Sequence, residues 1–333
     1  MILERPSTAK RWLLACSEWS WSRERRGLSS SPRCRPRAPR DSVAGVRATS
    51  LTIGDRTFDI TDRALVMGIL NRTPDSFYDK GATFALDDLV RRAEKLVDDG
   101  ADLLDVGGVK AGPGPVVDEA EELDRVVPTI EALRARFDIA LSVDTWRASV
   151  AKEAYAAGAV VGNDISGFAD PDYLATAAAA GATVVATHIR LGPRIPDPEP
   201  DYDDVVDAVR TYLLERASWA HTAGLTPDRV VLDAGLDLGK TAEQSLALLR
   251  GSDQLASLGY PLLLSASNKT FLGVVLGLEI GERRQASLAA AALGAALGCR
   301  IMRVHDVAAH RQLCAILASV SASRDSAAAP AVS

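Results

Sequence analysis

Polar side chains stand at the ends of eight short apolar runs, where a buried core would not place them. Paired carboxylates and an amide suit a flat ligand with an amidine-like or guanidine-like edge, because they accept its N–H bonds. Lysine, arginine and histidine suit a phosphate, and a neutral amide oxygen suits a Mg²⁺ ion that keeps most of its waters. The set indicates a planar polar heterocycle that carries a phosphate or pyrophosphate. Its members are Asn71, Asp105, Asp144, Asn163, Asp164, His188, Asp233, Ser267, Asn268, Lys269, Arg303, His305 and Asp306.

The apolar runs predict buried parallel strands, and a stretch of helical length follows each of them. The strands are expected at 65–70, 103–106, 140–143, 160–162, 183–186, 230–232, 261–264 and 300–304. The helices are expected at 86–99, 118–137, 146–157, 171–180, 202–223, 241–258, 280–297 and 307–320. Eight such units in about 255 residues predict a (β/α)8 TIM barrel; a doubly wound sheet usually has fewer strands. The strand ends of a barrel share one rim, so the polar set should converge there.

The two ends of the chain differ from this body. A hairpin is expected over 52–60, where it could plug the bottom of the barrel. Residues 1–47 hold eleven Lys and Arg against four acidic residues and lack periodicity, which predicts a disordered basic extension. Their apolar patch is too short for a secretory signal; of a transit peptide and a dispensable extension from an upstream start codon, we favour the second. The barrel domain is expected over 48–320, with a disordered tail at 321–333.

Charge and cysteine content exclude several classes of protein. The chain beyond residue 47 has a formal charge of −13, so it offers no evident surface for nucleic acid. No apolar run approaches the length of a membrane span. Cys16, Cys34, Cys299 and Cys314 lack CxxC spacing, which argues against a zinc site and fits the reducing cytoplasm.

At these residues the chain resembles the dihydropteroate synthase family. The motifs are GILNRTPDSF at 68–77, DVGG at 105–108, SVDT at 142–145, NDISG at 163–167 and RVHD at 303–306. They occur in order between about residues 64 and 320, over most of a barrel-sized segment. The resemblance implies a (β/α)8 barrel, usually dimeric, that acts in folate synthesis. Such enzymes join 6-hydroxymethyl-7,8-dihydropterin diphosphate to 4-aminobenzoate and release pyrophosphate.

The resemblance also implies a role for each matching residue. The expected pterin-binding residues are Asp144, Asn163, Asp233 and Lys269. Arg303 and His305 would hold the pyrophosphate, with Mg²⁺ at Asn71. Phe77 lies on the loop after the first strand, and Ser267 near the aminobenzoate. The expected catalytic residues are Asp105, Asp75, Lys269 and Arg303.

The loop after the second strand departs from the family pattern. The family usually has Gly-Gly-Glu-Ser-Thr-Arg-Pro-Gly, whereas residues 107–114 read GGVKAGPG. Ala111 and Gly112 thus replace a threonine and an arginine, and the nearby Lys110 is not a bidentate group. The patterns around Thr187, over 233–240 and at Asn268 are altered as well. In these departures the chain resembles the divergent second homologue of actinobacteria.

Three hypotheses follow. The first is a working dihydropteroate synthase, and the second is a divergent paralogue that binds pterin phosphate with weak, altered or no synthase activity. The third is another pterin-dependent barrel, such as the methyltetrahydrofolate-binding half of a corrinoid methyltransferase. Arg303 and His305 count against the third, because a folate without a diphosphate has no need of them. The apolar stretch 286–297 predicts core packing rather than a dimer face alone, although the family implies a homodimer.

Overall fold

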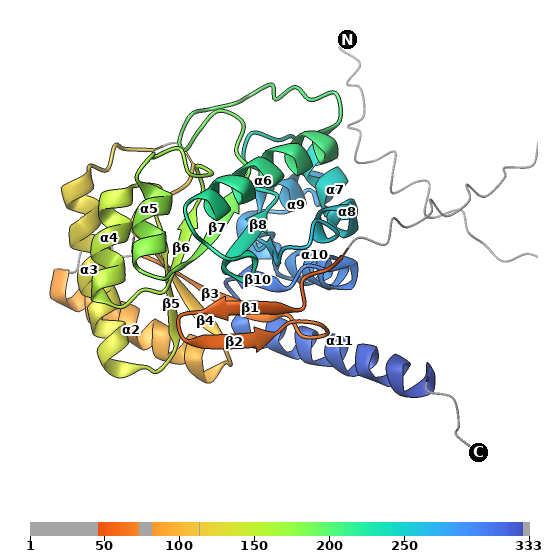
Figure 1. Ribbon diagram of the computed structural model, residues 1–333, viewed down its shortest axis with the longest axis horizontal. Helices are drawn as coiled ribbons and strands as arrows, with labels where there is room; N and C mark the ends of the chain where they lie inside the picture. Colours follow the sequence, from red (N-terminus) through yellow and green to blue (C-terminus); the bar gives the residue numbers. More distant parts are fainter. Residues whose placement is uncertain (1–45, 73–81, 113, 329–333) are drawn as a thin grey trace, which may run out of the picture.

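Eight parallel strands close into a barrel in the computed structural model, which describes residues 46–72, 82–112 and 114–328 (Figure 1). Neighbouring strands follow chain order, and the last strand pairs with the first. The expected TIM barrel is confirmed, because helices alternate with the strands around it. The strands are β3 (Leu65–Asn71), β4 (Leu103–Gly107), β5 (Ala140–Asp144), β6 (Val161–Asp164), β7 (Thr183–Thr187), β8 (Val230–Asp233), β9 (Leu262–Leu264) and β10 (Ile301–Val304).

Side chains alternate between the inside and the outside of the barrel, because successive residues of a strand point to opposite faces. Leu103 and Val231 belong to a buried cluster inside the barrel, whereas Leu104 packs in the outer layer between strands and helices. The residues two positions further along, Asp105 and Asp233, therefore also face the inside. The lower part of the interior is apolar, and its upper part, at the carboxyl ends of the strands, is polar.

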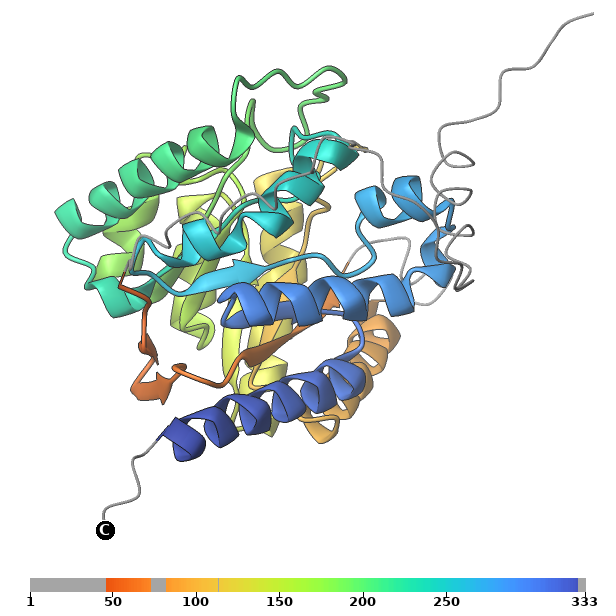
Figure 2. The ribbon, with the colours of Figure 1, turned by 90° about the vertical axis from the view of Figure 1, so that its right-hand side faces the viewer.

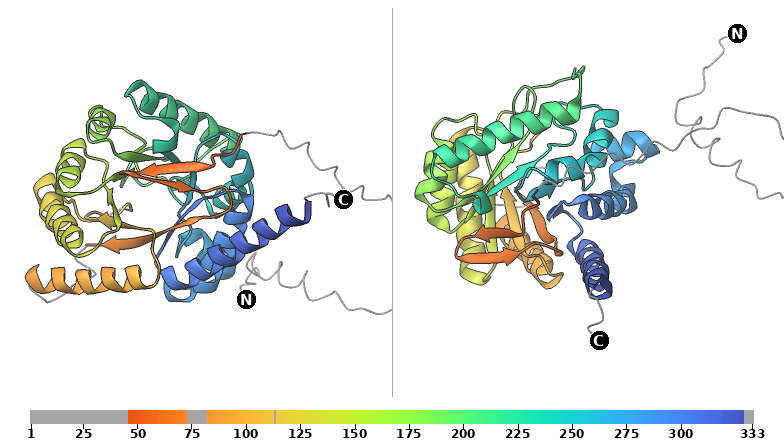
Figure 3. Two further views of the ribbon diagram at one scale, coloured as in Figure 1. Left: turned by 60° about the horizontal axis from the view of Figure 1, so that its bottom comes forward. Right: turned by 45° about the vertical axis from the view of Figure 1, so that its right-hand side comes forward.

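An antiparallel hairpin of β1 (Ser50–Ile53) and β2 (Arg56–Asp59) precedes the barrel, as expected. It lies across the end of the barrel at which the strands begin (Figure 3, left). Leu51 and Ile53 are buried in one cluster with Leu65 and other inward-facing strand residues. The hairpin therefore closes the lower end of the barrel with apolar side chains.

Polar contacts fix this hairpin to the barrel. Arg229, in the 3-10 turn η2 (Pro227–Arg229), donates to the carbonyl of Gly54 at 2.8 Å and to that of Gly181 at 2.7 Å. The Thr52 hydroxyl donates to Asp228 at 2.5 Å. These bonds join the turn of the hairpin to the loops that precede β7 and β8.

Ten α-helices are described around the barrel (Figures 1 and 2). They are α2 (Ala82–Asp98), α3 (Glu119–Arg136), α4 (Ala148–Ala157), α5 (Tyr173–Ala179), α6 (Val205–Thr222), α7 (Ala242–Arg250), α8 (Ser252–Ala256), α9 (Thr270–Leu276), α10 (Arg284–Leu297) and α11 (Val307–Ala328). A second 3-10 turn, η3 (Ile280–Glu282), precedes α10. None of the helices in the described ranges is long and apolar enough to cross a membrane.

Three helices differ from expectation. The stretch 241–258 is two helices rather than one, because the backbone of Gly251 (φ −89°, ψ 12°) leaves the helical region between α7 and α8. Helix α9 was not predicted, since its seven residues are too few to show a helical period. Helix α11 continues past residue 320 to Ala328, so this part of the expected disordered tail is helical. Residues 321–328 contain neither glycine nor proline, and alanine, the best helix former, is frequent among them.

Helix α10 contains the apolar stretch 286–297. Ala286, Ala290, Ala291 and Ala295 are buried in the outer core, as expected of core packing. Leu293 is exposed. Packing against the barrel therefore accounts for most of the apolar character of this stretch.

Candidate active site

The carboxyl ends of the strands bring polar side chains from different parts of the sequence into the mouth of the barrel. Asp105 on β4, Asp144 on β5 and Arg303 on β10 are joined directly by hydrogen bonds. Asn163 on β6 bonds to the same group. Asp233 on β8 occupies the equivalent inward position. The predicted convergence is therefore present for these five residues.

Arg303 is held by two carboxylates. Its Nε donates to Asp105 Oδ2 at 2.6 Å, and its Nη2 donates to Asp144 Oδ2 at 2.7 Å. Asp105 also accepts a hydrogen bond from Ser142 Oγ at 2.5 Å and from Asn163 Nδ2 at 3.0 Å. Because Asp105 is completely buried and serves three donors, its carboxylate orients Arg303 and Asn163.

Charges in this cluster shift the pKa values of its members. Burial opposes the charged form of Arg303, but the carboxylates of Asp105 and Asp144 outweigh it and raise the pKa of the guanidinium. Burial raises the pKa of Asp144 to about 7, although Arg303 lowers it. Arg303 thus stays positively charged, and Asp144 is the carboxylate whose protonation changes near neutral pH.

Asp233 and Lys269 lie on neighbouring strand ends. Asp233 Oδ1 accepts the N–H of Gly235 at 2.8 Å, and Lys269 Nζ donates to the carbonyl of Leu236 at 3.0 Å. Burial raises the pKa of Asp233 and lowers that of Lys269, while the opposite charge of each favours the ionised form of the other. Asp233 and Asn163 are only 6% and 3% exposed, so a ligand that reaches them would be largely enclosed.

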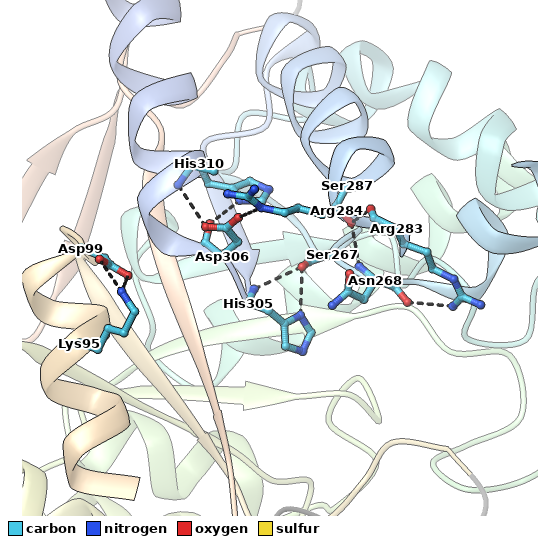
Figure 4. A network of polar contacts seen from close by, with 11 residues as sticks. Lys95, Asp99, Ser267, Asn268, Arg283, Arg284, Ser287, His305, Asp306 and His310 are labelled. Atoms are coloured by element: carbon cyan, nitrogen blue, oxygen red, sulfur yellow. Dashed lines mark hydrogen bonds and ion pairs between the residues drawn. The ribbon is translucent and has the colours of Figure 1, made fainter. Parts of the chain in front are cut away.

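Ser267 and His305 form a second polar contact at the mouth (Figure 4). Ser267 Oγ lies 3.0 Å from His305 Nδ1, and it also accepts the backbone N–H of His305 at 3.2 Å. Burial, followed by the charge of Arg303, lowers the pKa of His305 to about 4. His305 is therefore neutral at pH 7 and can serve a phosphate only by hydrogen bonding.

Asn71 ends β3 beside the carboxylate cluster. A Cβ placed on Gly107 would lie 3.2 Å from Asn71 Oδ1 and 3.7 Å from Asp144 Oδ2. Both oxygens therefore lie close to Gly107, where a side chain would crowd Asn71. Asp75 and Phe77, expected on the loop after this strand, lie outside the described residues.

Some strand-end residues serve the scaffold instead. Asp164 faces outward and accepts the N–H groups of Ser166 at 2.6 Å and Phe168 at 2.8 Å. Asp306 is paired with Arg284 and accepts the N–H of Ala309 in the first turn of α11 (Figure 4). These carboxylates stabilise turns and a helix start, which is the other common role of aspartate at such positions.

A buried lysine was not predicted as part of the site. Lys240 Nζ lies 2.9 Å from His188 Nδ1 and donates to the carbonyls of Gly235 at 2.8 Å and Leu238 at 2.9 Å. Burial lowers the pKa of Lys240 to about 7 and that of His188 to about 3. The signal for Lys240 in the sequence is its place directly after a glycine-rich segment that follows a strand. Lysine is rarely buried without partners, so its burial here indicates that the backbone carbonyls of this segment hold it.

The altered loop after β4 is open at Gly112. Nothing among the described residues lies within 4 Å of a Cβ placed on Gly112, where the family pattern has an arginine. A side chain can therefore start from this position without a clash at its Cβ.

Comparison with known proteins connects this arrangement to a family. A family model described as "Pterin binding enzyme" matches residues 67–305, which include Asp105, Asp144, Asn163, Asp233 and Arg303. The inactive dihydropteroate synthase 2 of Mycobacterium leprae (strain TN) is 46% identical over 271 residues, which cover 79% of this chain and 92% of that protein. The chain belongs to the dihydropteroate synthase family.

Other dihydropteroate synthases match over a similar length. That of Synechocystis sp. (strain ATCC 27184 / PCC 6803 / Kazusa) is 40% identical over 279 residues, 83% of this chain and 96% of that protein. The crystal structure of Burkholderia cenocepacia dihydropteroate synthase complexed with 7,8-dihydropteroate has a TM-score of 0.75 at 37% identity and covers 84% of this chain and 99% of that chain. The resemblance inferred from the motifs is confirmed, and the family and fold are those of a transferase of the dihydropteroate synthase type.

Proposed function

We propose that the protein binds 6-hydroxymethyl-7,8-dihydropterin diphosphate in the barrel mouth and joins it to 4-aminobenzoate, with release of pyrophosphate. The convergence of Asn163, Asp233, Lys269 and Arg303 on this mouth is the observation that carries the proposal. Amide and carboxylate oxygens complement the N–H-rich edge of a pterin, and a guanidinium complements a diphosphate. Solved relatives bound to 7,8-dihydropteroate support the same assignment.

Burial of Asp233 determines how the site binds the pterin. Asp233 is buried, and this burial disfavours its charged form and raises its pKa. A pterin that donates two N–H bonds to this carboxylate restores the lost solvation, so binding and burial favour each other. Asn163 is held in place by Asp105, which presents its amide to the same ligand.

The reaction breaks the bond between the pterin methylene carbon and the bridging diphosphate oxygen, and the electron pair leaves with pyrophosphate. The aminobenzoate nitrogen forms the new bond to that carbon and then loses a proton. Arg303, kept charged by Asp105 and Asp144, stabilises the departing negative charge. Neutral His305 adds a hydrogen bond, and the enclosed mouth holds the two substrates in line.

We further propose that Mg²⁺ accompanies the diphosphate at Asn71. Among the described residues, no three or more His, Cys, Asp or Glu side chains gather into a metal site. The donor set nevertheless fits an ion held mainly by phosphate and water, because Asn71 offers one amide oxygen beside the carboxylate of Asp144. A bound ion would neutralise part of the diphosphate charge.

A second candidate function is pterin-phosphate binding with weak, altered or no synthase activity. Ala111 and Gly112 stand where the family has a threonine and an arginine, which favours this candidate. The relatives named inactive dihydropteroate synthase 2 are 46–47% identical to the chain, against 40% for the Synechocystis synthase. We therefore expect intact pterin binding and slow turnover.

Three measurements separate the candidates. Calorimetry of the full chain with the pterin diphosphate, with and without Mg²⁺, tests the binding site against the unphosphorylated pterin as a control. Pyrophosphate release with 4-aminobenzoate, and growth of a bacterial strain that lacks its own synthase, test the reaction. Binding with growth supports the synthase, binding without growth supports the second candidate, and the absence of binding refutes both.

We also propose that the protein is a homodimer in the cytoplasm. An exposed apolar surface on α9 and η3 supports an interface, because such surfaces usually mark contacts with a partner. Its members are Val274, Val275, Leu276 and Ile280. Sedimentation velocity tests the dimer, and a monomer at micromolar concentration would reject it.

The proposed location in the cytoplasm is supported by the cysteines. The free, buried thiols of Cys299 and Cys314 suit a reducing compartment.

A further inference from the structure

The segment between β7 and α6, residues 188–204, reaches across the rim to the segment between β4 and α3. Arg194 makes this connection. Its Nη2 donates to the carbonyl of Gly114 at 2.6 Å and to that of Pro115 at 2.5 Å. Its backbone N–H donates to the carbonyl of Ala111 at 3.3 Å. One residue therefore binds backbone carbonyls on both sides of Gly112, in the loop in which the family threonine and arginine are missing.

The backbone of Arg194 is held in an unfavourable conformation. Its φ of 64° lies in the left-handed region, which an arginine seldom adopts. Such a conformation persists only where surrounding contacts impose it, and it is often found at functional sites. Charge-assisted hydrogen bonds from the guanidinium to two carbonyls are contacts of sufficient strength.

The 188–204 segment is itself fixed to the pterin side of the mouth. At its start, His188 contacts the buried Lys240, which also binds the carbonyl of Gly235 directly after the β8 strand end. Near its end, the Tyr202 hydroxyl donates to the carbonyl of Gly239 at 2.8 Å. The segment is thus anchored at two points to the loop that follows Asp233.

The loop after β4 also begins at the site. Gly107 faces the side-chain oxygens of Asn71 and Asp144, and Lys110 follows three residues later. On the side of α3 and α4, Arg125 donates to the carbonyl of Gly108 at 2.7 Å and Arg147 donates to that of Val117 at 2.8 Å. Arg194 adds contacts from the segment between β7 and α6 to the stretch between these two points, which includes Lys110 and Gly112.

We propose that Arg194 is a positioning residue that holds the loop after β4, and with it Lys110, against the pterin side of the mouth. This inference rests on the proposed function, because it assigns the loop to the binding and reaction of the second substrate. Arg194→Ala should therefore impair aminobenzoate binding while pterin binding remains.

The experiment compares Arg194→Ala with Arg229→Ala in the full chain. Arg229 is a matched control, because it also donates to two backbone carbonyls but lies at the lower end of the barrel. Hydrogen exchange of the backbone amides at 110–117 should accelerate by about tenfold or more in Arg194→Ala and stay unchanged in Arg229→Ala. Arg194→Lys keeps the charge but lacks the planar guanidinium with its several N–H donors, so its hydrogen-exchange rate should be intermediate.

The functional readout is a split between the two substrates. In Arg194→Ala, the Kd of the pterin diphosphate should change by less than about twofold, and the KM for aminobenzoate should rise by about tenfold or more. If the wild type has no measurable turnover, calorimetry of aminobenzoate with the protein saturated by pterin and pyrophosphate replaces the KM. Equal loss of affinity for both substrates would mean that the role of Arg194 is general stability, and this would overturn the proposal.

The exchange measurement is independent of the proposed function. Absence of pterin binding in the wild type would refute the proposed function, whereas unchanged exchange at 110–117 in Arg194→Ala would refute the positioning role. If Arg194→Ala fails to fold, Arg194→Met keeps the apolar length of the side chain and allows the same comparison. Matching melting temperatures of the variants and the wild type confirm that the exchange is local.

Discussion

Replacement of Asp105 by asparagine tests the carboxylate–arginine cluster most directly. The change keeps the shape of the side chain but removes the charge that pairs with Arg303. It also turns an NH2 group toward one or more of three hydrogen-bond donors. Because Asp105 is fully buried and the Arg303 side chain is only 16% exposed, water cannot replace the lost partner. Removal of one partner of a buried ion pair typically costs about 3–5 kcal/mol, and we expect a loss in this range.

The assay is urea unfolding, with the slope of the transition compared between variants to check that the unfolding reaction is the same. Asp138→Asn is the matched control. Asp138 is paired with Arg56 at 2.7 Å, but both side chains are largely exposed, so we expect a change of about 0–1 kcal/mol. In the double variant Asp105→Asn with Arg303→Met, the Asp144 carboxyl loses its arginine and its pKa rises further, so part of the loss should be recovered at a pH where Asp144 is protonated and neutral.

The result that would refute this reasoning is a loss in Asp105→Asn no larger than in the exposed control. Arg303 would then be stabilised by Asp144 alone. Because Asp105 raises the pKa of Asp144, its neutralisation should also lower that pKa. A carbon-13 NMR titration of the Asp144 carboxyl can measure this shift in the same variant.

Four further predictions concern the ligand, the loop and the head. Burial raises the pKa of the Asp144 carboxyl to about 7, so pterin affinity should rise with pH up to about 7 and then level off. Calorimetry checks this, and Asp144→Asn should abolish the dependence of pterin affinity on pH. Asp233→Ala should cost about 2–5 kcal/mol of pterin affinity, and an unchanged Kd would disprove its assigned role. Ala111→Thr with Gly112→Arg should raise kcat/KM for aminobenzoate by about 10²–10³, which steady-state kinetics would show. A chain that begins at Ala48 should keep its melting temperature and pterin affinity; a marked fall in either would show that residues 1–47 contribute.

The strands could be predicted from the sequence because their residues are mostly apolar, which indicates burial. A parallel strand covered on both faces is an apolar run, and a polar residue marks where it ends, as at Asp144 and Asp233. Their convergence followed from the barrel, because all strand ends share one rim. The division of 241–258 at Gly251 was missed, since a single glycine is tolerated within many helical patterns.

Side-chain pairing within the site could not be predicted in the same way. Asp105 and Arg303 are 198 positions apart, and their contact depends on closure of the barrel and on the register of every strand between them. The neutral state of His305 depends on burial and on the nearby charge of Arg303, neither of which the motif reveals. The connection made by Arg194 runs between two irregular loops, which have no periodic pattern to place them.

The apolar hairpin closes the lower end of the barrel, which is then open only at the mouth. Asn163 and Asp233 are almost fully buried inside the barrel. Because Leu51 and Ile53 cover the end of the barrel at which the strands begin, a ligand can approach this pair only from the mouth. The hairpin thus limits the direction of approach to the site, although it lies at the other end of the barrel.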